Sequence, residues 1–234
     1  MDPVRIAELL QPFIALDPGA AADAPLLNQV SVYLDLLLRW NARMNLTAVR
    51  EPDAIITRHF GESFFAGKHV LLREAATPPI HLIDIGSGAG FPGLPIKLLS
   101  PTIRTTLIES NQKKVTFLRE VVRALELADV DVIQARAEDA AMPSPSGRNL
   151  VTLRAVERFD TILPTAIKMM ASTGIIALLI GQSQYDTIPH SGIEWSAPIP
   201  IPDSQSRILL VGQRAYSPIS VMPENKKVGD AASL

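Results

Sequence analysis

A glycine-rich segment near the middle of the chain constrains the fold more than any other part of the sequence. It reads Asp-Ile-Gly-Ser-Gly-Ala-Gly-Phe-Pro-Gly over residues 84–93, follows the apolar run Ile80–Ile85 and opens a helical pattern that reaches Leu99. Glycine is needed where the backbone turns tightly or must approach a ligand without an intervening Cβ. In an open α/β sheet such a turn lies at the carboxyl ends of the strands, where ligands bind. The segment therefore predicts a strand, a ligand-binding turn and a helix.

Short apolar runs recur after this segment and alternate with helical patterns. The clearest helix begins after Asn111, a favourable N-cap, and would bury Val115, Leu118, Val122 and Leu125 on one face. Repeated units of this kind predict an α/β fold with a mostly parallel sheet and helices on both faces. The expected strands are Ile80–Ile85, Thr105–Ile108, Val130–Ala135, Leu150–Leu153, Ile175–Ile180 and Ile208–Val211.

The residues before Thr77-Pro78-Pro79 predict a helical N-terminal extension over residues 1–74. Apolar residues recur at spacings of three and four between Leu26 and Trp40, and a second helix is expected after the turn Glu51-Pro52-Asp53. The core of the fold is expected over residues 75–216. Prolines, serines and a glycine predict a loop over residues 140–148, and the polar residues 217–234 predict a disordered tail.

Composition narrows the possible functions. The absence of cysteine excludes disulfides, zinc–thiolate sites and cysteine nucleophiles, and no metal is expected. The net charge of −2 gives no general attraction to nucleic acid. Residues 36–73 and 97–123 nevertheless carry positive excesses of three and four, which suit RNA phosphates but also occur on solvated helix faces. Neither a signal peptide nor an uncharged apolar stretch of about 18 residues is present, which favours a cytoplasmic protein without membrane contact.

The glycine segment also contains the dinucleotide fingerprint G-x-G-x-x-G at residues 88–93, so an NAD-linked oxidoreductase is one alternative. A pyrophosphate would bind free backbone N–H groups at the start of the helix, and Pro92 and Pro95 each remove one. S-adenosylmethionine contains no phosphate, and its amino group favours a nearby acid. The prolines therefore favour S-adenosylmethionine over NAD.

An S-adenosylmethionine site would take residues from successive strand ends. Asp84 is expected to help hold the amino group of the cofactor, and Glu109, at the end of the next strand, is placed to accept both ribose hydroxyls. Ala137 and Glu138 follow the third strand, where a loop borders the adenine ring. The glycines that leave room for the cofactor are Gly86, Gly88 and Gly90.

Several motifs together carry a resemblance to a known family. The core contributes residues 84–93 above, Leu-Ile-Glu-Ser-x-x-Lys-Lys-x-x-Phe-Leu (107–118), Ala-Arg-Ala-Glu (135–138) and Arg-Ala-Val (154–156), and the N-terminal part contributes Trp40-Asn41, Asn45-Leu46-Thr47 and Arg58-His59. From about Leu26 to Gly181 the chain resembles the bacterial small-subunit ribosomal RNA guanine-N7 methyltransferase family, the glucose-inhibited division protein B type. Many methyltransferases share the glycine turn, whereas the Asn-Leu-Thr and Arg-His motifs make this resemblance specific.

The resemblance implies a Rossmann-like class I methyltransferase fold and S-adenosylmethionine as cofactor. Arg154 would act as a positioning residue, because guanine N7 has an in-plane lone pair and no proton, so that transfer to it needs no general base. The implied cofactor contacts are Gly86, Phe91, Ala137, Glu138 and Arg154. The residues expected on the RNA side are Arg39, Arg43, Asn45, Arg58 and His59.

The sequence departs from the family's pattern in three places. Glu62 and Asn149 stand where aspartate is usual, and Ile180 stands where lysine is frequent. A second alternative, which fits if Ile180 and Asn149 have cost the protein its activity, is a non-catalytic RNA-binding or assembly factor with the same fold. Otherwise the expected partner is small-subunit ribosomal RNA or the assembled small ribosomal subunit, and the protein is expected to be a monomer.

Overall fold

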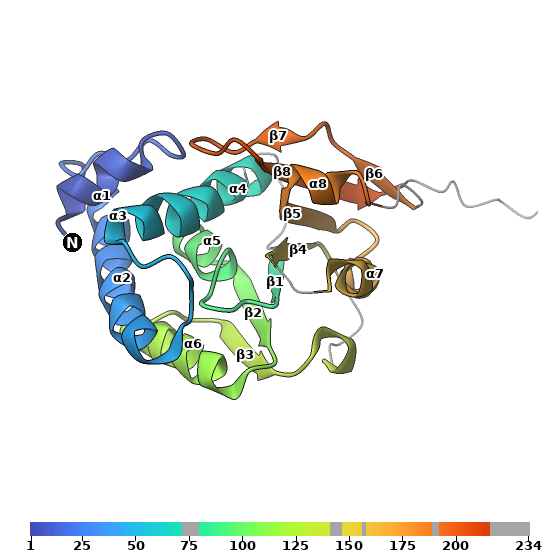
Figure 1. Ribbon diagram of the computed structural model, residues 1–234, viewed down its shortest axis with the longest axis horizontal. Coiled ribbons are helices and arrows are strands. Elements are labelled where there is room, and N and C mark those ends of the chain that lie inside the picture. Colours follow the sequence, from blue (N-terminus) through green and yellow to red (C-terminus); the bar gives the residue numbers. More distant parts are fainter. Residues whose placement is uncertain (72–79, 141–146, 156–157, 189–191, 216–234) are drawn as a thin grey trace, which may run out of the picture.

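The computed structural model describes residues 1–71, 80–140, 147–155, 158–188 and 192–215 (Figure 1). The expected boundary between residues 74 and 75, most of the expected loop over 140–148 and the expected tail over 217–234 lie outside these residues.

A sheet of eight strands forms the centre of the fold, in the order β3-β2-β1-β4-β5-β8-β6, with β7 paired to β8. The five strands from β3 to β5 are parallel, and β8 is antiparallel to β5. Chain order reverses between β1 and β4, which is where α/β folds place a ligand. The strands are β1 (His81–Ile85), β2 (Arg104–Glu109), β3 (Val130–Gln134), β4 (Asn149–Arg154), β5 (Ile175–Gly181), β6 (Ile193–Trp195), β7 (Ile199–Pro200) and β8 (Arg207–Arg214).

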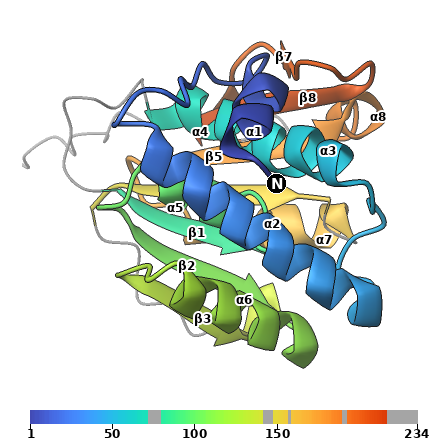
Figure 2. The same ribbon diagram turned by 90° about the vertical axis from the view of Figure 1, so that its left-hand side faces the viewer.

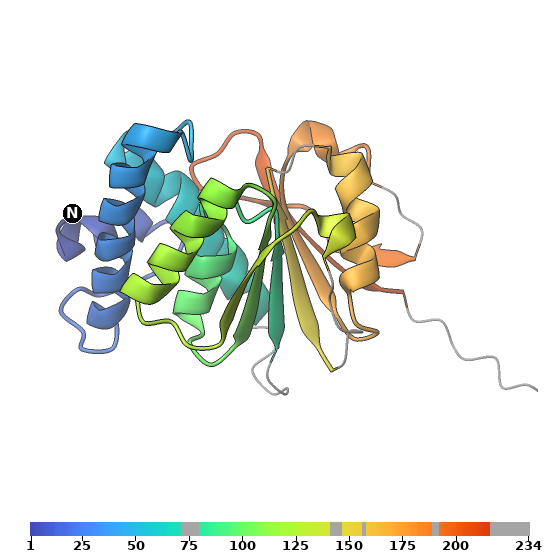
Figure 3. The ribbon, with the colours of Figure 1, turned by 90° about the horizontal axis from the view of Figure 1, so that it is seen from below.

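Both faces of the sheet are covered, because nearly every side chain of β1, β4 and β5 is buried. In β1, Leu82 packs in the core on the side of α4 and α5, whereas Ile83 and Ile85 pack in the core on the side of α7. Figure 3 shows the sheet edge-on, with α7 on one side and the other long helices on the opposite side. The helices next to the sheet are α7 (Phe159–Met169) on one side and α4 (Glu62–Leu71), α5 (Gly93–Leu99) and α6 (Gln112–Ala124) on the other.

The N-terminal helices form an outer layer on the side of α4, α5 and α6. In Figure 2, α2 passes in front of α5, and α6 lies below it. The helix α2 contacts both. Tyr33 and Leu37 of α2 are fully buried in one core that also contains Leu107 of β2 and Phe117 of α6. The N-terminal extension therefore packs directly on the sheet and does not form a separate core. Its elements are α1 (Pro3–Leu10), α2 (Ala24–Met44), α3 (Pro52–Ile55) and the π-helical turn η1 (Ile56–Gly61), which continues into α4.

The capping prediction for α6 is confirmed, since the Asn111 side chain accepts hydrogen bonds from the backbone N–H groups of Lys113 and Lys114. All six expected strands are present with bounds shifted by at most a few residues. Sequence patterns did not predict α1, the short helix α8 (Gln182–Tyr185), β6 or β7. These elements are short, and their periodicity is too brief to distinguish from that of loops.

Candidate functional site

The glycine turn leaves β1 in the conformation that its composition predicts. Gly86, Gly88 and Gly90 have φ values of 68°, 59° and 91°, which other residues rarely adopt. A Cβ on Gly90 would collide with the Tyr33 hydroxyl, which donates a hydrogen bond of 2.5 Å to the Ala89 carbonyl. Glycine is therefore needed at position 90 because of its backbone conformation and because Tyr33 and Leu94 leave no room for a side chain.

Asp84 lies beneath this turn and is completely buried. Its carboxylate accepts hydrogen bonds from the Thr152 hydroxyl at 2.7 Å and from the Gly93 N–H at 3.2 Å. Burial raises the pKa of Asp84 to about 6, although both hydrogen bonds oppose the shift. The structure therefore does not bring Asp84 to an open surface, and its carboxylate instead joins β1 to β4 and to the start of α5.

A cavity of about 480 Å³ opens at the carboxyl ends of β1 to β4. Four of the predicted cofactor residues line it: Gly86, Glu109, Ala137 and Glu138. The remaining lining residues are Ile85, Ile108, Ser110, Asn111, Lys114, Ala135, Arg136, Ala155, Arg158 and Ile162. The volume suits a small-molecule ligand of nucleoside size.

Glu109 holds two parts of the cavity wall together. One carboxylate oxygen accepts from the Gly88 N–H at 2.9 Å and the other from the Asn111 N–H at 2.7 Å. The side chain is thereby fixed between the glycine turn and the first residues of α6. An acid held in this way has acceptor capacity left for hydroxyl donors, because each carboxylate oxygen has two lone pairs.

Gly88, Gly90 and Phe91, which were also predicted to contact the cofactor, are not among the residues that line the cavity. Gly88 and Gly90 belong to the turn, and Phe91 is only 7% exposed. The Phe91 ring stacks on Tyr33, with centroids 5.4 Å apart, and on His59, with centroids 5.0 Å apart. Phe91 thus supports the glycine turn from the side of α2 and η1.

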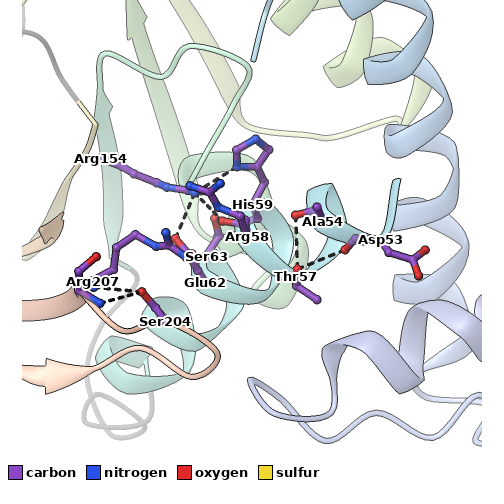
Figure 4. A network of polar contacts seen from close by, with 11 residues as sticks. Asp53, Ala54, Thr57, Arg58, His59, Glu62, Ser63, Arg154, Ser204 and Arg207 are labelled. Atoms are coloured by element: carbon purple, nitrogen blue, oxygen red, sulfur yellow. Dashed lines mark hydrogen bonds and ion pairs between the residues drawn. The ribbon is translucent and has the colours of Figure 1, made fainter. Parts of the chain in front are cut away.

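Arg154, at the end of β4, is not among the residues that line the cavity, and its side chain points towards η1 (Figure 4). Its guanidinium donates to the backbone carbonyls of Arg58 and His59 and to His59 Nδ1 at 3.1 Å. It also pairs with Glu62 at 3.1 Å. A positioning function of Arg154 agrees with these contacts, and its direct contact with the cofactor stays a prediction.

His59 is a neutral, hydrogen-bonded histidine. Nδ1 faces the Arg154 donor, so Nε2 carries the proton and donates to the Thr47 hydroxyl at 2.8 Å. Burial, together with the positive charges of Arg154 and Arg58, lowers the pKa of His59 to about 3. Both ring nitrogens are engaged within the protein, so His59 shapes the site rather than offering a group to RNA.

Three arginines predicted on the RNA side, Arg39, Arg43 and Arg58, are exposed and are called here the arginine set. Arg39 and Arg43 border a second cavity of about 790 Å³ that is also lined by Trp40, Ala42, Met44 and Glu120. Arg58 lies on η1, beside Arg154.

Asn45 ends α2 in a left-handed conformation with φ 47°, and its side-chain oxygen accepts from Arg50 at 2.7 Å. It therefore closes the helix, although its exposed position leaves it accessible to RNA. Asparagine tolerates this conformation better than most residues, which explains its place at the helix end.

Two departures from the family's pattern have structural explanations. Asn149 is at the amino end of β4, where its amide donates to the Met169 carbonyl at 2.6 Å and its oxygen accepts from the Ala171 N–H at 2.8 Å. An aspartate could make only the second bond. Ile180 is 3% exposed and packs in the core on the side of α7. Neither residue lines the cavity.

Lys114, Arg136 and Arg158 also line the cavity and were not predicted as site residues. Lys114 could have been found from its place in the first turn of α6, directly after β2. Arg158 has a left-handed conformation with φ 58°, which no local sequence signal indicates. Among the described residues no group of acids and histidines has the arrangement of a metal site, and no helix is long and apolar enough to cross a membrane.

Comparisons with known proteins agree with this geometry. The family model of rRNA small subunit methyltransferase G matches residues 26–198. A ribosomal RNA small subunit methyltransferase G from Chloroflexus aggregans is 39% identical over 200 residues, covering 78% of this chain and 79% of that protein. The corresponding protein from Xylella fastidiosa strain 9a5c is 34% identical, covering 82% of this chain and 91% of its own.

One solved structure, a SAM dependent methyltransferase from Aquifex aeolicus, superimposes with a TM-score of 0.53 at 13% identity, covering 72% of this chain and 96% of that chain. At this identity the likeness concerns the fold alone, which is that of the Rossmann-like methyltransferases.

Proposed function

Because the chain belongs to the rRNA small subunit methyltransferase G family, we propose that it transfers a methyl group from S-adenosylmethionine to N7 of a guanine in small-subunit ribosomal RNA. The observation that carries the assignment of the site is the Glu109 carboxylate, held by two backbone N–H groups at the wall of a cavity of about 480 Å³. The cofactor, when bound, supplies an electrophilic methyl group on its sulfonium.

The residues of the cavity fit this cofactor. Glu109 offers acceptors for ribose hydroxyls, and Ala137 and Ile162 offer apolar surface for an adenine ring. Gly86 is exposed beside them and places no side chain over the turn. Asp84, Phe91 and the remaining glycines would act from behind, by fixing the shape of the turn.

The backbone of the turn fits a dinucleotide less well. The N–H groups of the turn already donate within the protein: Gly86 and Ser87 to the Ile108 carbonyl, Gly88 to Glu109, Gly90 and Phe91 to the Ser87 carbonyl, and Gly93 to Asp84. A pyrophosphate would need several of these donors. This arrangement argues against the NAD-linked alternative.

Transfer to guanine N7 requires alignment and no proton removal. Holding the reacting groups in line can lower the barrier by about 7–11 kcal/mol. Arg154 and the neutral His59 suit this requirement, because they fix η1 and Phe91 next to the turn and do not offer a base. The non-catalytic alternative depended on Asn149 and Ile180 reducing activity. Both residues have structural contacts away from the cavity, which argues against that alternative.

We further propose that RNA lies over the arginine set, that the substrate is small-subunit ribosomal RNA or the assembled small ribosomal subunit, and that the protein acts as a cytoplasmic monomer. Purified protein would be incubated with methyl-labelled S-adenosylmethionine and either naked small-subunit RNA or small subunits from cells lacking the gene. Label recovered as N7-methylguanine from either substrate supports the proposal, and the substrate that becomes labelled identifies the form of the RNA on which the protein acts. Label in another nucleoside, or no label in either substrate, would refute it.

A further inference from the structure

A continuous series of polar contacts runs from α2 to β8 across the end of β4. We call it the polar chain; its members are Asn41, Thr47, His59, Arg154, Glu62 and Arg207. The Asn41 side-chain oxygen accepts from the Thr47 N–H at 3.0 Å, and the Thr47 hydroxyl meets His59. Beyond Arg154, Glu62 pairs with Arg207 at 2.6 Å. Residues as distant in sequence as 41 and 207 are thereby connected through direct contacts.

Glu62 is the single acid of the polar chain and the most buried of its charged members. Its side chain is 1% exposed, against 11% for Arg154 and 28% for Arg207. Each carboxylate oxygen faces one guanidinium, and neither makes a well-angled hydrogen bond with the described residues. Charge balance is therefore the main contribution of Glu62. Removing one partner of such a buried group leaves an uncompensated charge, which is strongly unfavourable.

The Arg154 guanidinium that Glu62 neutralises is the group that holds η1. Its nitrogens donate to the carbonyls of Arg58 and His59, two consecutive residues of the π-turn. Single π-turns occur frequently at functional sites, where they alter the direction of neighbouring side chains. At this turn the Arg58 side chain is exposed to solvent. The neighbouring His59 ring stacks on Phe91, which supports the glycine turn.

We propose that Glu62 and Arg207 are positioning residues, which hold Arg154 against η1 and so set where Arg58 stands relative to the RNA base. The inference rests on the proposed function for its substrate. Arg207 comes from β8, where it lies opposite Gly181 at the end of β5, so this strand also takes part in shaping the RNA side of the site (Figure 4).

Four variants test the proposal: Glu62→Gln, which removes the charge at nearly constant size, Glu62→Asp, which keeps it, Arg207→Met, and the control Glu194→Gln at an exposed site on β6. Folding would be checked by thermal melting, and cofactor affinity by calorimetry. Methyl transfer to small subunits would give kcat and KM. Hydrogen exchange of peptides covering residues 56–61 would report on η1 without depending on activity.

Glu62→Gln should lower kcat by about 10- to 100-fold, because small displacements of reacting groups have effects of this size. Its S-adenosylmethionine Kd should stay within about twofold of wild type, since Glu109 and the cavity wall are unchanged. Exchange in residues 56–61 should accelerate, Glu62→Asp should regain part of the lost kcat, and the control should match wild type. Arg207→Met should show the same pattern in weaker form.

A folded Glu62→Gln variant with a lowered Tm but wild-type kcat and exchange would overturn the proposal, since Glu62 would then be only structural. If that variant does not fold, Arg207→Met and Glu62→Asp decide by the same criteria. Should wild-type protein fail to methylate guanine N7, the proposed function would be wrong, while hydrogen exchange would still show whether Glu62 holds η1.

Discussion

Replacing Glu109 by alanine removes the group that joins the glycine turn to α6. Its two oxygens accept from the N–H groups of Gly88 and Asn111, at 2.9 and 2.7 Å, and the side chain is 6% exposed. The same carboxylate is the expected acceptor for the ribose hydroxyls. The variant should therefore lose both cofactor affinity and stability.

Hydrogen bonds to charged groups contribute about 1.5–3 kcal/mol each. Loss of one such interaction with the ribose raises the cofactor Kd by about 10- to 150-fold, at 1.36 kcal/mol for each factor of ten. The free energy of unfolding should fall by about 1–3 kcal/mol, because the two backbone donors lose their charged acceptor next to a cavity where water can replace it.

Glutamine at position 109 should lie closer to alanine than to wild type. Both partners of Glu109 are N–H donors, so the single amide oxygen of glutamine can satisfy only Gly88 or Asn111. The glutamine NH₂ group would then face the other backbone N–H, so that two donors oppose each other. Rotating the amide by half a turn only moves this donor–donor conflict from one backbone N–H to the other.

Isothermal titration calorimetry with S-adenosylmethionine measures the affinity, and urea denaturation measures the stability. Glu194→Ala, at an exposed position on β6, serves as the matched control. A folded Glu109→Ala protein with the wild-type Kd would refute the reasoning, and Glu109 would then only connect the turn to α6.

Three further predictions concern the turn and the RNA side. Gly90→Ala should lose at least about 2 kcal/mol of unfolding free energy, measured by urea titration, because its Cβ meets Tyr33 and lies 2.7 Å from Leu94. Gly88→Ala should lose only about 1 kcal/mol, because the nearest atom to its Cβ is 3.7 Å away. Equal losses in the two variants would contradict this prediction. Alanine at all of the arginine set should raise KM and lower the salt slope of RNA binding by about 2, with unchanged cofactor affinity, and an unaltered slope would place the RNA elsewhere. Since burial raises the pKa of Asp84 from 3.8 to about 6, the folded state binds the extra proton, and its contribution to stability should decrease by about 3 kcal/mol as pH rises from about 4 to 6. Asp84→Asn should lack this component in melts across that range, and parallel pH profiles for the two proteins would argue against it.

The sequence was sufficient to predict the parts of the fold that depend on local patterns. The glycine turn, the cap at Asn111 and the six main strands were predicted correctly because each depends on backbone preferences or on the period of apolar residues within a short window. Glu109 could be placed for the same reason, since an acid ending the strand after a glycine turn must lie at the shared edge of a parallel sheet.

Whether a side chain near this edge of the sheet is covered or open could not be predicted in this way. Asp84 is the last residue but one of β1 and Glu109 is the last residue of β2, yet Asp84 is enclosed in the core beside Thr152 whereas Glu109 lines the cavity. Asp84 pairs with Leu107, two residues before Glu109, so the two side chains lie on the same face of the sheet. Asp84 lies deeper, against Gly93 at the start of α5, whereas Glu109 lies at the end of its strand beside the cavity. How far a helix covers this face depends on packing between separate parts of the chain.

By itself, the sequence determined the α/β fold, the position of the turn and the family of the protein, because these follow from local patterns and motifs. Only the tertiary structure decided that Arg154 supports η1, that His59 is neutral and that Glu62 balances Arg207. These contacts join residues that are up to 145 positions apart in the chain. Their geometry depends on the order of the strands and on the packing of the N-terminal helices, and no window of sequence contains that information.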